Sequence, residues 1–374
     1  MAKIKIMTIF GTRPEAIKMA PVVKELETRD EIESIVCVTA QHREMLDQVL
    51  DTFNIIPNYD LNIMQQDQTL SEITIRALSG LETIMKEIKP DIVLVHGDTT
   101  TTYIGALSAF YNQIDVGHVE AGLRTYNIYS PYPEEANRQM VSCIASINFA
   151  PTQLSCENLE KEGRKNIFVT GNTAIDAMKT TISNDYKHEI LNWVNSDKLV
   201  LLTAHRRENL GAPMYNIFRG IKRVVDEEEN IKVIYPVHKN PKVREIANEV
   251  FKGHPRIKLI EPLEVIDFHN IMNKSYIILT DSGGIQEEAP SLGKPVLVLR
   301  DTTERPEGIE AGTLKLVGTN EEKIYDALKE LLNNYEEYEK MSKATNPYGD
   351  GHASKKIVDC IIKKYYGGNS DNDQ

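Results

Sequence analysis

The chain has 374 residues, of which 41% are hydrophobic and 26% are charged, a composition typical of a globular protein long enough for two domains. Its formal net charge of -12 argues against nucleic acid or an anionic membrane surface as a general partner. An anionic ligand would therefore need a locally basic pocket within an acidic protein.

Cysteine usage and the first residues bear on the cellular compartment. The four cysteines are scattered and form no C-x-x-C pair, which favours reduced thiols in a cytosolic protein. The chain enters an apolar strand at once instead of a signal peptide, and no apolar run approaches the ~20 residues of a membrane span. We therefore expect a cytoplasmic protein without a membrane segment.

The first half of the chain repeats an apolar strand, a polar or glycine-containing turn and an amphipathic helix. The continuous apolar run at 91–96 is typical of a parallel strand covered on both faces. The expected strands lie at 4–10, 35–39, 91–96, 116–119 and 167–169. The expected helices lie at 16–28, 44–53, 70–88, 101–111 and 134–147.

After a candidate hinge at 171–173, the second half restarts this alternation. The expected strands lie at 199–203, 231–235, 257–260, 276–279, 296–299 and 314–317. The expected helices lie at 214–227, 241–250, 267–273, 286–292, 321–333 and 354–365. The pattern predicts an α/β protein with two doubly wound, Rossmann-like domains facing one cleft, with binding sites at the carboxyl ends of the strands. The polar tail at 368–374 is expected to be disordered.

The turn Ser282-Gly283-Gly284 separates the apolar strand at 276–279 from a helix. Ser282 is a natural helix N-cap, and the two glycines allow a ligand close to backbone N–H groups, as in phosphate sites. Glu288, about one turn into the helix, could accept hydrogen bonds from ribose hydroxyls. The alternative is a capped turn that binds nothing.

The first strand is followed by Gly11-Thr12-Arg13-Pro14-Glu15, at the usual ligand-binding position of a doubly wound sheet. Arg13 could hold a phosphate or carboxylate in a bidentate fork, and Lys18 adds a second positive charge. The stretch matches neither the Walker A nor the G-x-G-x-x-G pattern, and Arg13 could equally be a surface arginine near a helix start.

Three acidic positions follow strands or begin helices in the first half. Asp98 precedes four consecutive threonines, which favour helix poorly, and it could be an N-cap or an acid, base or hydroxyl acceptor. Glu120 follows an apolar strand and is flanked by apolar residues and two glycines. Glu134 begins a helix, where the helix dipole favours a carboxylate for structural reasons alone.

The second half adds possible cations at 205–207 after a strand and a charged loop at 301–307 that could close over a ligand. The chain contains no H-E-x-x-H motif and no convincing metal-ligand constellation. Cations and helix N-termini suited to a diphosphate, Glu288 for a ribose and several carboxylates in the other domain indicate an enzyme acting on a nucleotide sugar.

At this point the chain resembles the bacterial non-hydrolysing UDP-N-acetylglucosamine 2-epimerases, from about residue 3 to residue 365. The motifs that carry the resemblance occur in order at 10–16, 39–43, 96–102, 117–124, 203–208, 280–288 and 300–307. The resemblance implies a glycosyltransferase-B fold. Its first domain would span 1–171 and be completed by a final helix at 352–367, and its UDP-binding domain would span 172–351.

The resemblance also implies the reaction. UDP-GlcNAc and UDP-ManNAc would interconvert at sugar carbon 2 by elimination of UDP to 2-acetamidoglucal and re-addition, supplying ManNAc for cell-surface polysaccharide. This chemistry needs cations on the leaving diphosphate and general acid–base groups at the sugar, with no metal and no other cofactor. UDP-GlcNAc, UDP-ManNAc and UDP are the implied ligands, and a homodimer is the family's usual state.

Site residues follow from the matching positions. The implied catalytic residues are Asp98, Glu120, Glu134 and His205. The implied substrate-binding residues are Arg13, Lys18, Phe268 near the uracil, Ser282, Gly283, Gly284, Glu288 and Arg305.

Some members of the family bind a second UDP-GlcNAc as an activator. The positions that match this subsite are Gln41, Glu134, Arg206 and His238. Glu44 and Asp67, however, stand where such members carry a glutamine and an arginine. Because a cation is lost at position 67, we expect weaker or altered activation.

Three other functions share parts of this pattern. A glycosyltransferase of the same fold would need an acceptor site, and its first domain would not need so many carboxylates. A hydrolysing epimerase would differ only in letting water capture the glycal and release ManNAc. A catalytically silent nucleotide-sugar sensor would not need the charged site positions that are all filled here.

Overall fold

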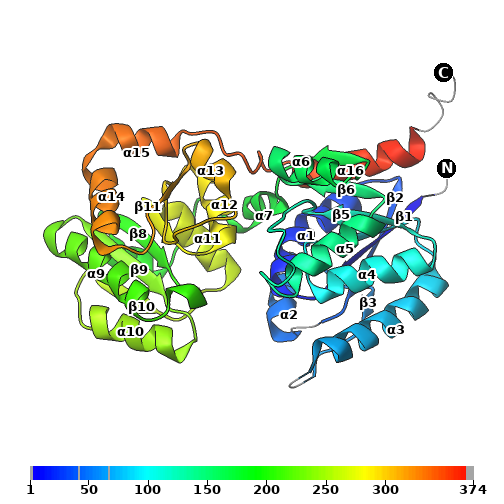
Figure 1. Cartoon of the computed structure of the whole chain (residues 1–374), viewed down its shortest axis with the longest axis horizontal. Coiled ribbons are helices and arrows are strands. Elements are labelled where there is room, and N and C mark those ends of the chain that lie inside the picture. The colour runs from blue at the N-terminus through cyan, green and yellow to red at the C-terminus, as the bar shows by residue number, and fades with distance from the viewer. Residues whose placement is uncertain (1–2, 41–42, 66–67, 368–374) are drawn as a thin grey trace. The chain divides into compact units, whose positions relative to one another are not determined.

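The computed structural model describes residues 3–40, 43–65 and 68–367 and divides into two compact units (Figure 1). The first unit comprises Met1–Thr180 and Tyr348–Gln374, and the second comprises Thr181–Pro347. None of the helices in the described ranges combines the length and the apolar character that crossing a membrane requires.

The first unit contains a seven-stranded parallel sheet in the order β3-β2-β1-β4-β5-β6-β7. Its strands are β1 (Ile4–Phe10), β2 (Ile32–Val38), β3 (Tyr59–Asp60), β4 (Ile92–His96), β5 (Asp115–Val119), β6 (Ile147–Ala150) and β7 (Ile167–Val169). Its helices are α1 (Arg13–Glu27), α2 (Arg43–Thr52), α3 (Leu70–Ile88), α4 (Thr100–Tyr111), α5 (Glu134–Ile144), α6 (Gln153–Lys161), α7 (Thr173–Thr181) and α16 (Ala353–Tyr366).

The second unit contains a six-stranded parallel sheet in the order β10-β9-β8-β11-β12-β13. Its strands are β8 (Lys198–Thr203), β9 (Ile231–Pro236), β10 (Ile257–Ile260), β11 (Ile277–Thr280), β12 (Val296–Val298) and β13 (Leu314–Leu316). Its helices are α8 (Glu189–Val194), the 3-10 turn η1 (Arg207–Asn209), α9 (Ala212–Glu227), α10 (Pro241–Phe251), α11 (Val265–Lys274), α12 (Gly283–Ser291), α13 (Pro306–Glu310), α14 (Glu321–Asn333) and α15 (Tyr335–Ser342).

The predicted fold class, α/β with two doubly wound parallel sheets, is confirmed. Each sheet is parallel throughout, and strands such as β4 and β11 are buried along their whole length. Because helices cover both faces, these strands carry uninterrupted apolar runs instead of alternating polar and apolar residues.

The unit boundary lies at Thr180 instead of the predicted residue 171. The reason is that α7 belongs to the first unit. Its Asp176 carboxylate accepts hydrogen bonds from the backbone N–H groups of Ala353 and Ser354 at 3.1 and 2.8 Å, at the start of α16. The first unit also resumes at Tyr348, ahead of the predicted residue 352.

The prediction missed β6 and α6 and extended the preceding helix to residue 147. Ile144 and Ile147 keep the spacing of a helix face, so the apolar pattern alone continues the helix. The backbone leaves the helix at Ala145, and Ile147 instead begins a strand that pairs with β5 and β7. Pairing with neighbouring strands therefore overrode a locally helical pattern.

The final helix, α16, completes the first unit's core. Its apolar face, which includes Ile357 and Ile361, joins the buried cluster formed with α1 and β1. Arg29 at the end of α1 pairs with Asp359 of α16 at 2.8 Å. The chain thus returns to its first domain with a helix whose burial helps to stabilise that domain.

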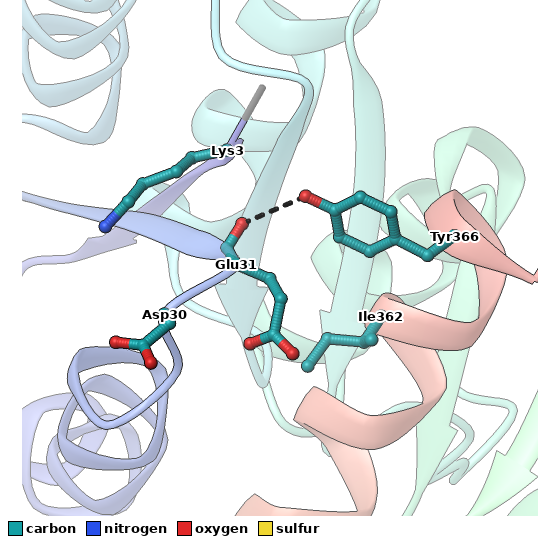
Figure 2. A pocket seen from close by; sticks show the side chains of 5 residues that line it. All are labelled: Lys3, Asp30, Glu31, Ile362 and Tyr366. Carbon is teal, nitrogen blue, oxygen red and sulfur yellow. Dashed lines mark hydrogen bonds between the residues drawn. The ribbon is translucent and has the colours of Figure 1, made fainter. Parts of the chain in front are cut away.

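A cavity of about 500 Å³ lies at the amino edge of the first sheet (Figure 2). It is lined by Lys3 ahead of β1, Asp30 and Glu31 ahead of β2, and Ile362 and Tyr366 of α16. The Tyr366 hydroxyl donates to the Glu31 carbonyl at 3.3 Å, as Figure 2 shows. The candidate residues of the first unit lie at the opposite, carboxyl edge of this sheet, so this cavity is separate from them.

Candidate active site

In the first unit, the turns after β1 and β4 are joined by the buried carboxylate of Glu15. One carboxylate oxygen accepts the backbone N–H groups of Gly11 and Thr12 at 3.1 and 2.8 Å. The other accepts the hydroxyls of Thr99 and Thr102 at 2.7 and 3.0 Å. Burial raises the pKa of Glu15 above its ordinary value. Two of the four threonines, Thr99 and Thr102, therefore have a role as hydroxyl donors that solvate a carboxylate away from water.

Asp98 lies in the turn after β4 and is not the N-cap of α4. Thr99 occupies the cap position, and its hydroxyl oxygen accepts the N–H of Thr102. The Asp98 carboxylate instead pairs with Arg138 of α5. The backbone carbonyl of Asp98 accepts a hydrogen bond from the Asn137 side-chain amide at 2.9 Å. The N-cap interpretation is therefore wrong. The Asp98 carboxylate, paired with Arg138, remains a candidate acid, base or hydroxyl acceptor.

Glu120, directly after β5, adopts a left-handed backbone conformation with a φ of 62°. Such a conformation is costly for a residue with a Cβ, and strain of this kind is common at functional sites. Its carboxylate is paired with Lys18 of α1. The Glu120 side chain is mostly buried. It is positioned by a strained turn and paired with Lys18 from a different element.

His96, the last residue of β4, lies beside this carboxylate. Its Nε2 is 3.6 Å from Glu120 Oε2, and neither ring nitrogen has a hydrogen-bond partner among the described residues. Burial lowers the pKa of His96 to about 4, and the Lys18 charge adds to this effect while Glu120 opposes it. The imidazole is therefore neutral near pH 7.

Arg13 and Glu134 occupy the positions that the sequence indicated. Arg13 is half-buried at the start of α1, and its guanidinium makes no ion pair with any residue of the described ranges. Glu134 is half-buried at the first turn of α5. Its neighbour Glu135 is fully buried and accepts the backbone N–H groups of Thr125 and Tyr126, so Glu135 has the structural role.

In the second unit, Asp281 organises the turns after β8 and β11. It is fully buried, and its Oδ2 accepts the backbone N–H groups of His205 and Arg206 at 2.8 Å each and the Asn209 amide at 3.1 Å. The carboxylate therefore joins two turns that lie on neighbouring strands, as Glu15 does in the first unit.

His205 lies above this carboxylate, with its Nδ1 3.4 Å from Asp281 Oδ1. Its ring stacks on His238, with the ring centres 5.4 Å apart and the planes 13° apart. Burial lowers the pKa of His205 below its ordinary value, and Asp281 opposes this shift. The predicted catalytic histidine is thus partly buried and oriented by two neighbours.

The turn Ser282-Gly283-Gly284 leads into α12, as predicted, with Ser282 at the N-cap position. Its hydroxyl makes no capping hydrogen bond to the first N–H groups of the helix. A Cβ at Gly283 would lie 2.7 Å from the Arg305 guanidinium carbon. Glycine at 283 therefore allows the Arg305 guanidinium to lie against the helix N-terminus, where Arg305 also pairs with Glu287 at 2.7 Å. We call Ser282, Gly283, Gly284 and Arg305 the anion turn.

Glu288 and Phe268 lie on the helices beside the anion turn. The Glu288 carboxylate is 3.8 Å from His269 Nε2, and its Oε1 would be 3.6 Å from a Cβ at Gly284. Phe268 precedes His269 on α11, and their ring centres are 6.4 Å apart. The structure thus brings together in one unit the residues to which the sequence assigned the nucleotide.

The residues assigned to an activator subsite are only partly described. Arg206 Nε donates to the Asp281 carbonyl at 3.3 Å, and His238 stacks on His205. Gln41 and Asp67 lie outside the described residues.

Sequence reasoning missed the two carboxylates that organise the turns, Glu15 and Asp281, and the partner of Asp98, Arg138. Glu15 and Asp281 stand inside motifs that were noted, but their burial depends on tertiary structure. Within the described residues, no group of three or more His, Cys, Asp or Glu side chains could hold a metal ion.

Comparison with known proteins agrees with this geometry. The sequence model of the UDP-N-acetylglucosamine 2-epimerase family matches residues 24–362. The chain belongs to this family. It is 65% identical over 367 residues to the UDP-N-acetylglucosamine 2-epimerase of Bacillus subtilis, covering 98% of this chain and 97% of that protein.

Two solved structures extend the comparison to ligands of the relatives. The S. aureus MnaA–UDP structure is 57% identical, with a TM-score of 0.89 and 97% of each chain covered. The Neisseria meningitidis UDP-GlcNAc 2-epimerase bound to UDP-GlcNAc is 50% identical, with a TM-score of 0.87, covering 96% of this chain and 100% of that one.

Proposed function

We propose that this protein is a non-hydrolysing UDP-N-acetylglucosamine 2-epimerase that interconverts UDP-GlcNAc and UDP-ManNAc. One observation carries the proposal. The first unit holds two carboxylates, Asp98 and Glu120, each beside a cation, and the second unit holds the anion turn, in a chain that belongs to this family.

The second unit would bind the UDP portion. Helix N–H groups at the anion turn and the Arg305 guanidinium suit a diphosphate, because both are donors that carry positive charge or partial positive charge. Glu288 would accept the ribose hydroxyls, and Phe268 would lie near the uracil. His205, oriented by Asp281, would complete the polar surroundings of the leaving diphosphate.

The first unit would perform proton transfer at sugar carbon 2. The bond from carbon 1 to the β-phosphate oxygen breaks, and its electron pair leaves with UDP. A carboxylate takes the proton from carbon 2, and the C–H electron pair forms the C1=C2 bond of 2-acetamidoglucal. Protonation of carbon 2 from the opposite face, with re-addition of the UDP oxygen to carbon 1, gives the epimer.

The positive charges near the first-unit carboxylates serve this chemistry. Arg13 is available for an anionic group, and Lys18 is paired with the Glu120 carboxylate. Glu120, Asp98 and Glu134 are the candidate general acids and bases, with general acid–base catalysis worth roughly 10²–10⁴-fold in rate.

The proposal is tested by incubating the protein with UDP-GlcNAc in D2O and following carbon 2 by NMR. Epimerisation gives UDP-ManNAc with deuterium at carbon 2 and no free sugar. Free ManNAc with UDP would indicate a hydrolysing enzyme, glycosylation of an added acceptor would indicate a transferase, and no change would contradict catalysis altogether.

We further propose that activation by UDP-GlcNAc is weaker or altered compared with relatives that depend on it, because the resemblance places Asp67 where such relatives carry a cation. The test is turnover of UDP-ManNAc with and without added UDP-GlcNAc. Turnover of UDP-ManNAc alone at a rate near the activated one supports the proposal, and full dependence on UDP-GlcNAc contradicts it.

A further inference from the structure

Asn172, which lies just ahead of α7, makes a hydrogen bond that none of the sequence motifs indicated. Its side-chain amide donates to Glu120 Oε2 at 3.2 Å. Asn172 is only 3% exposed, so this contact lies away from bulk water. A neutral, buried donor of fixed position is therefore directed at one oxygen of the candidate base.

Two further hydrogen bonds determine where the Asn172 amide lies. The Asn172 Oδ1 accepts the backbone N–H of Ala174 at 2.9 Å, and the backbone N–H of Asn172 donates to the Tyr348 carbonyl at 2.7 Å. Gly171 and Gly349 also approach so closely that a Cβ on Gly171 would lie 3.2 Å from the Gly349 Cα. The backbone on both sides thus holds the amide in one orientation.

The groups that surround the Glu120 carboxylate differ in kind. Lys18 from α1 supplies charge on a flexible stem. His96 from β4 is neutral at 3.6 Å, while Asp98 and the buried His118 interact with the same charge network at longer range. Among the contacts described for Glu120, Asn172 supplies a rigid, uncharged donor, which suits it to orienting the carboxylate instead of neutralising it.

We propose that Asn172 is a positioning residue for Glu120, holding Oε2 so that the carboxylate presents a fixed direction to the proton on carbon 2. The inference rests on the proposed function, because it takes Glu120 as a proton-transfer group. Loss of such orientation lowers the rate of proton transfer more than substrate binding, since binding depends on the other groups of the site.

Asn172→Asp is the decisive variant. The aspartate keeps the oxygen that accepts the Ala174 N–H, and it replaces the donor to Glu120 by a carboxylate oxygen. We expect kcat to fall about 10- to 100-fold, the scale of one hydrogen bond to a charged group, with KM within about threefold of wild type. The acid limb of the pH–rate profile should move to higher pH, because a new anionic neighbour favours the protonated form of Glu120.

Two further variants separate positioning from stability. Asn172→Ala removes the donor without adding charge, and kcat should again fall about tenfold or more. Asn112→Asp removes a comparable amide donor, which binds the Ser108 carbonyl at 2.8 Å at the far end of α4, and should leave kcat and the pH profile unchanged. Tm of Asn172→Asp should fall, because the variant buries a second carboxylate beside Glu120, so kcat is compared at a temperature at which both proteins are fully folded.

The readout is deuterium incorporation at carbon 2 from D2O, measured with kcat, KM and Tm for each variant. Wild-type rates and an unshifted pH profile in Asn172→Asp would overturn this inference alone. An equal loss of kcat in Asn112→Asp, or a loss in Asn172→Asp that vanishes where both proteins are fully folded, would overturn it as well. A wild-type protein that incorporates no deuterium would overturn both this inference and the proposed function.

Discussion

The two units use the same device at the carboxyl edges of their sheets. In each, one buried carboxylate joins the turns that follow two neighbouring strands, Glu15 for β1 and β4 and Asp281 for β8 and β11. Both carboxylates accept backbone N–H groups from a strand-to-helix turn. One buried carboxylate thus accepts the N–H groups of the turns that water would otherwise solvate, and it orders the carboxyl edge of the sheet.

The units differ in what the ordered turns present. The first unit presents carboxylates with cationic partners, Asp98 with Arg138 and Glu120 with Lys18. The second unit buries its carboxylate and presents helix N–H groups, Arg305 and His205. Under the proposed function, the same framework would serve proton transfer in one unit and anion binding in the other, depending on the side chains placed above the buried acid.

The largest expected effect concerns the first unit's chemistry. Asp98→Asn and Glu120→Gln should each lower kcat by about 100-fold or more, because each removes a general acid–base group while keeping its shape. The measurement is steady-state epimerisation of UDP-GlcNAc. Near-wild-type rates in both variants would show that the first unit does not supply the proton-transfer groups. Glu82→Gln, on the exposed face of α3, is the matched control and should have no effect.

The second effect concerns the framework of the second unit. Asp281→Ala leaves the N–H groups of His205 and Arg206 and the Asn209 amide without their acceptor, and we expect the free energy of unfolding to fall by about 3 kcal/mol or more. Thermal or denaturant unfolding measures the loss. Asp326→Ala on the exposed side of α14 should change stability little, and an equal loss there would contradict the role of Asp281.

The third effect is a pH dependence of the first unit. His118 is fully buried and lies 2.7 Å from the Gly97 carbonyl, and burial lowers its pKa to about 4. The unfolded chain, with a histidine pKa near 6.5, binds more protons between these values, so stability is lost as pH falls from about 6.5 towards 4. Between neutral pH and pH 5, protonation linked to His118 should lower the free energy of unfolding by about 2 kcal/mol.

The measurement is the free energy of unfolding from pH 7 to pH 5 in wild type and in His118→Gln. The variant should lose less stability across this range, because its side chain takes up no proton. His352→Gln, an exposed histidine of the same unit, should retain the wild-type slope. Identical slopes in wild type and His118→Gln would show that His118 does not carry the effect.

The smallest effect tests the anion turn. Gly283→Ala places a Cβ where the Arg305 guanidinium lies, so we expect UDP affinity to fall about tenfold as the guanidinium is displaced. Gly284→Ala, whose Cβ would meet Glu288 at 3.6 Å in ordinary contact, should weaken binding less. Calorimetric titration with UDP decides between them, and unchanged affinity in Gly283→Ala would argue against a diphosphate at this turn.

The sequence by itself determined the alternation of strands and helices and the fold class, and it predicted the positions of the candidate site residues. Strands such as β1 and helices such as α3 carry complete local signals, and glycine or acidic residues after buried strands led to the predicted site positions. The motif order that indicated the family is likewise a property of the linear chain, and the match over 24–362 agrees with it.

Tertiary structure alone decided the contacts between turns that are distant in sequence. Nothing local indicates that Glu15 would collect hydroxyls from Thr99 and Thr102, that Asp98 would pair with Arg138, or that Asn172 would reach Glu120. These contacts exist because parallel strands bring their carboxyl ends to one edge. A carboxylate buried at that edge needs hydrogen-bond donors from the neighbouring turns, because its desolvation would otherwise destabilise the fold.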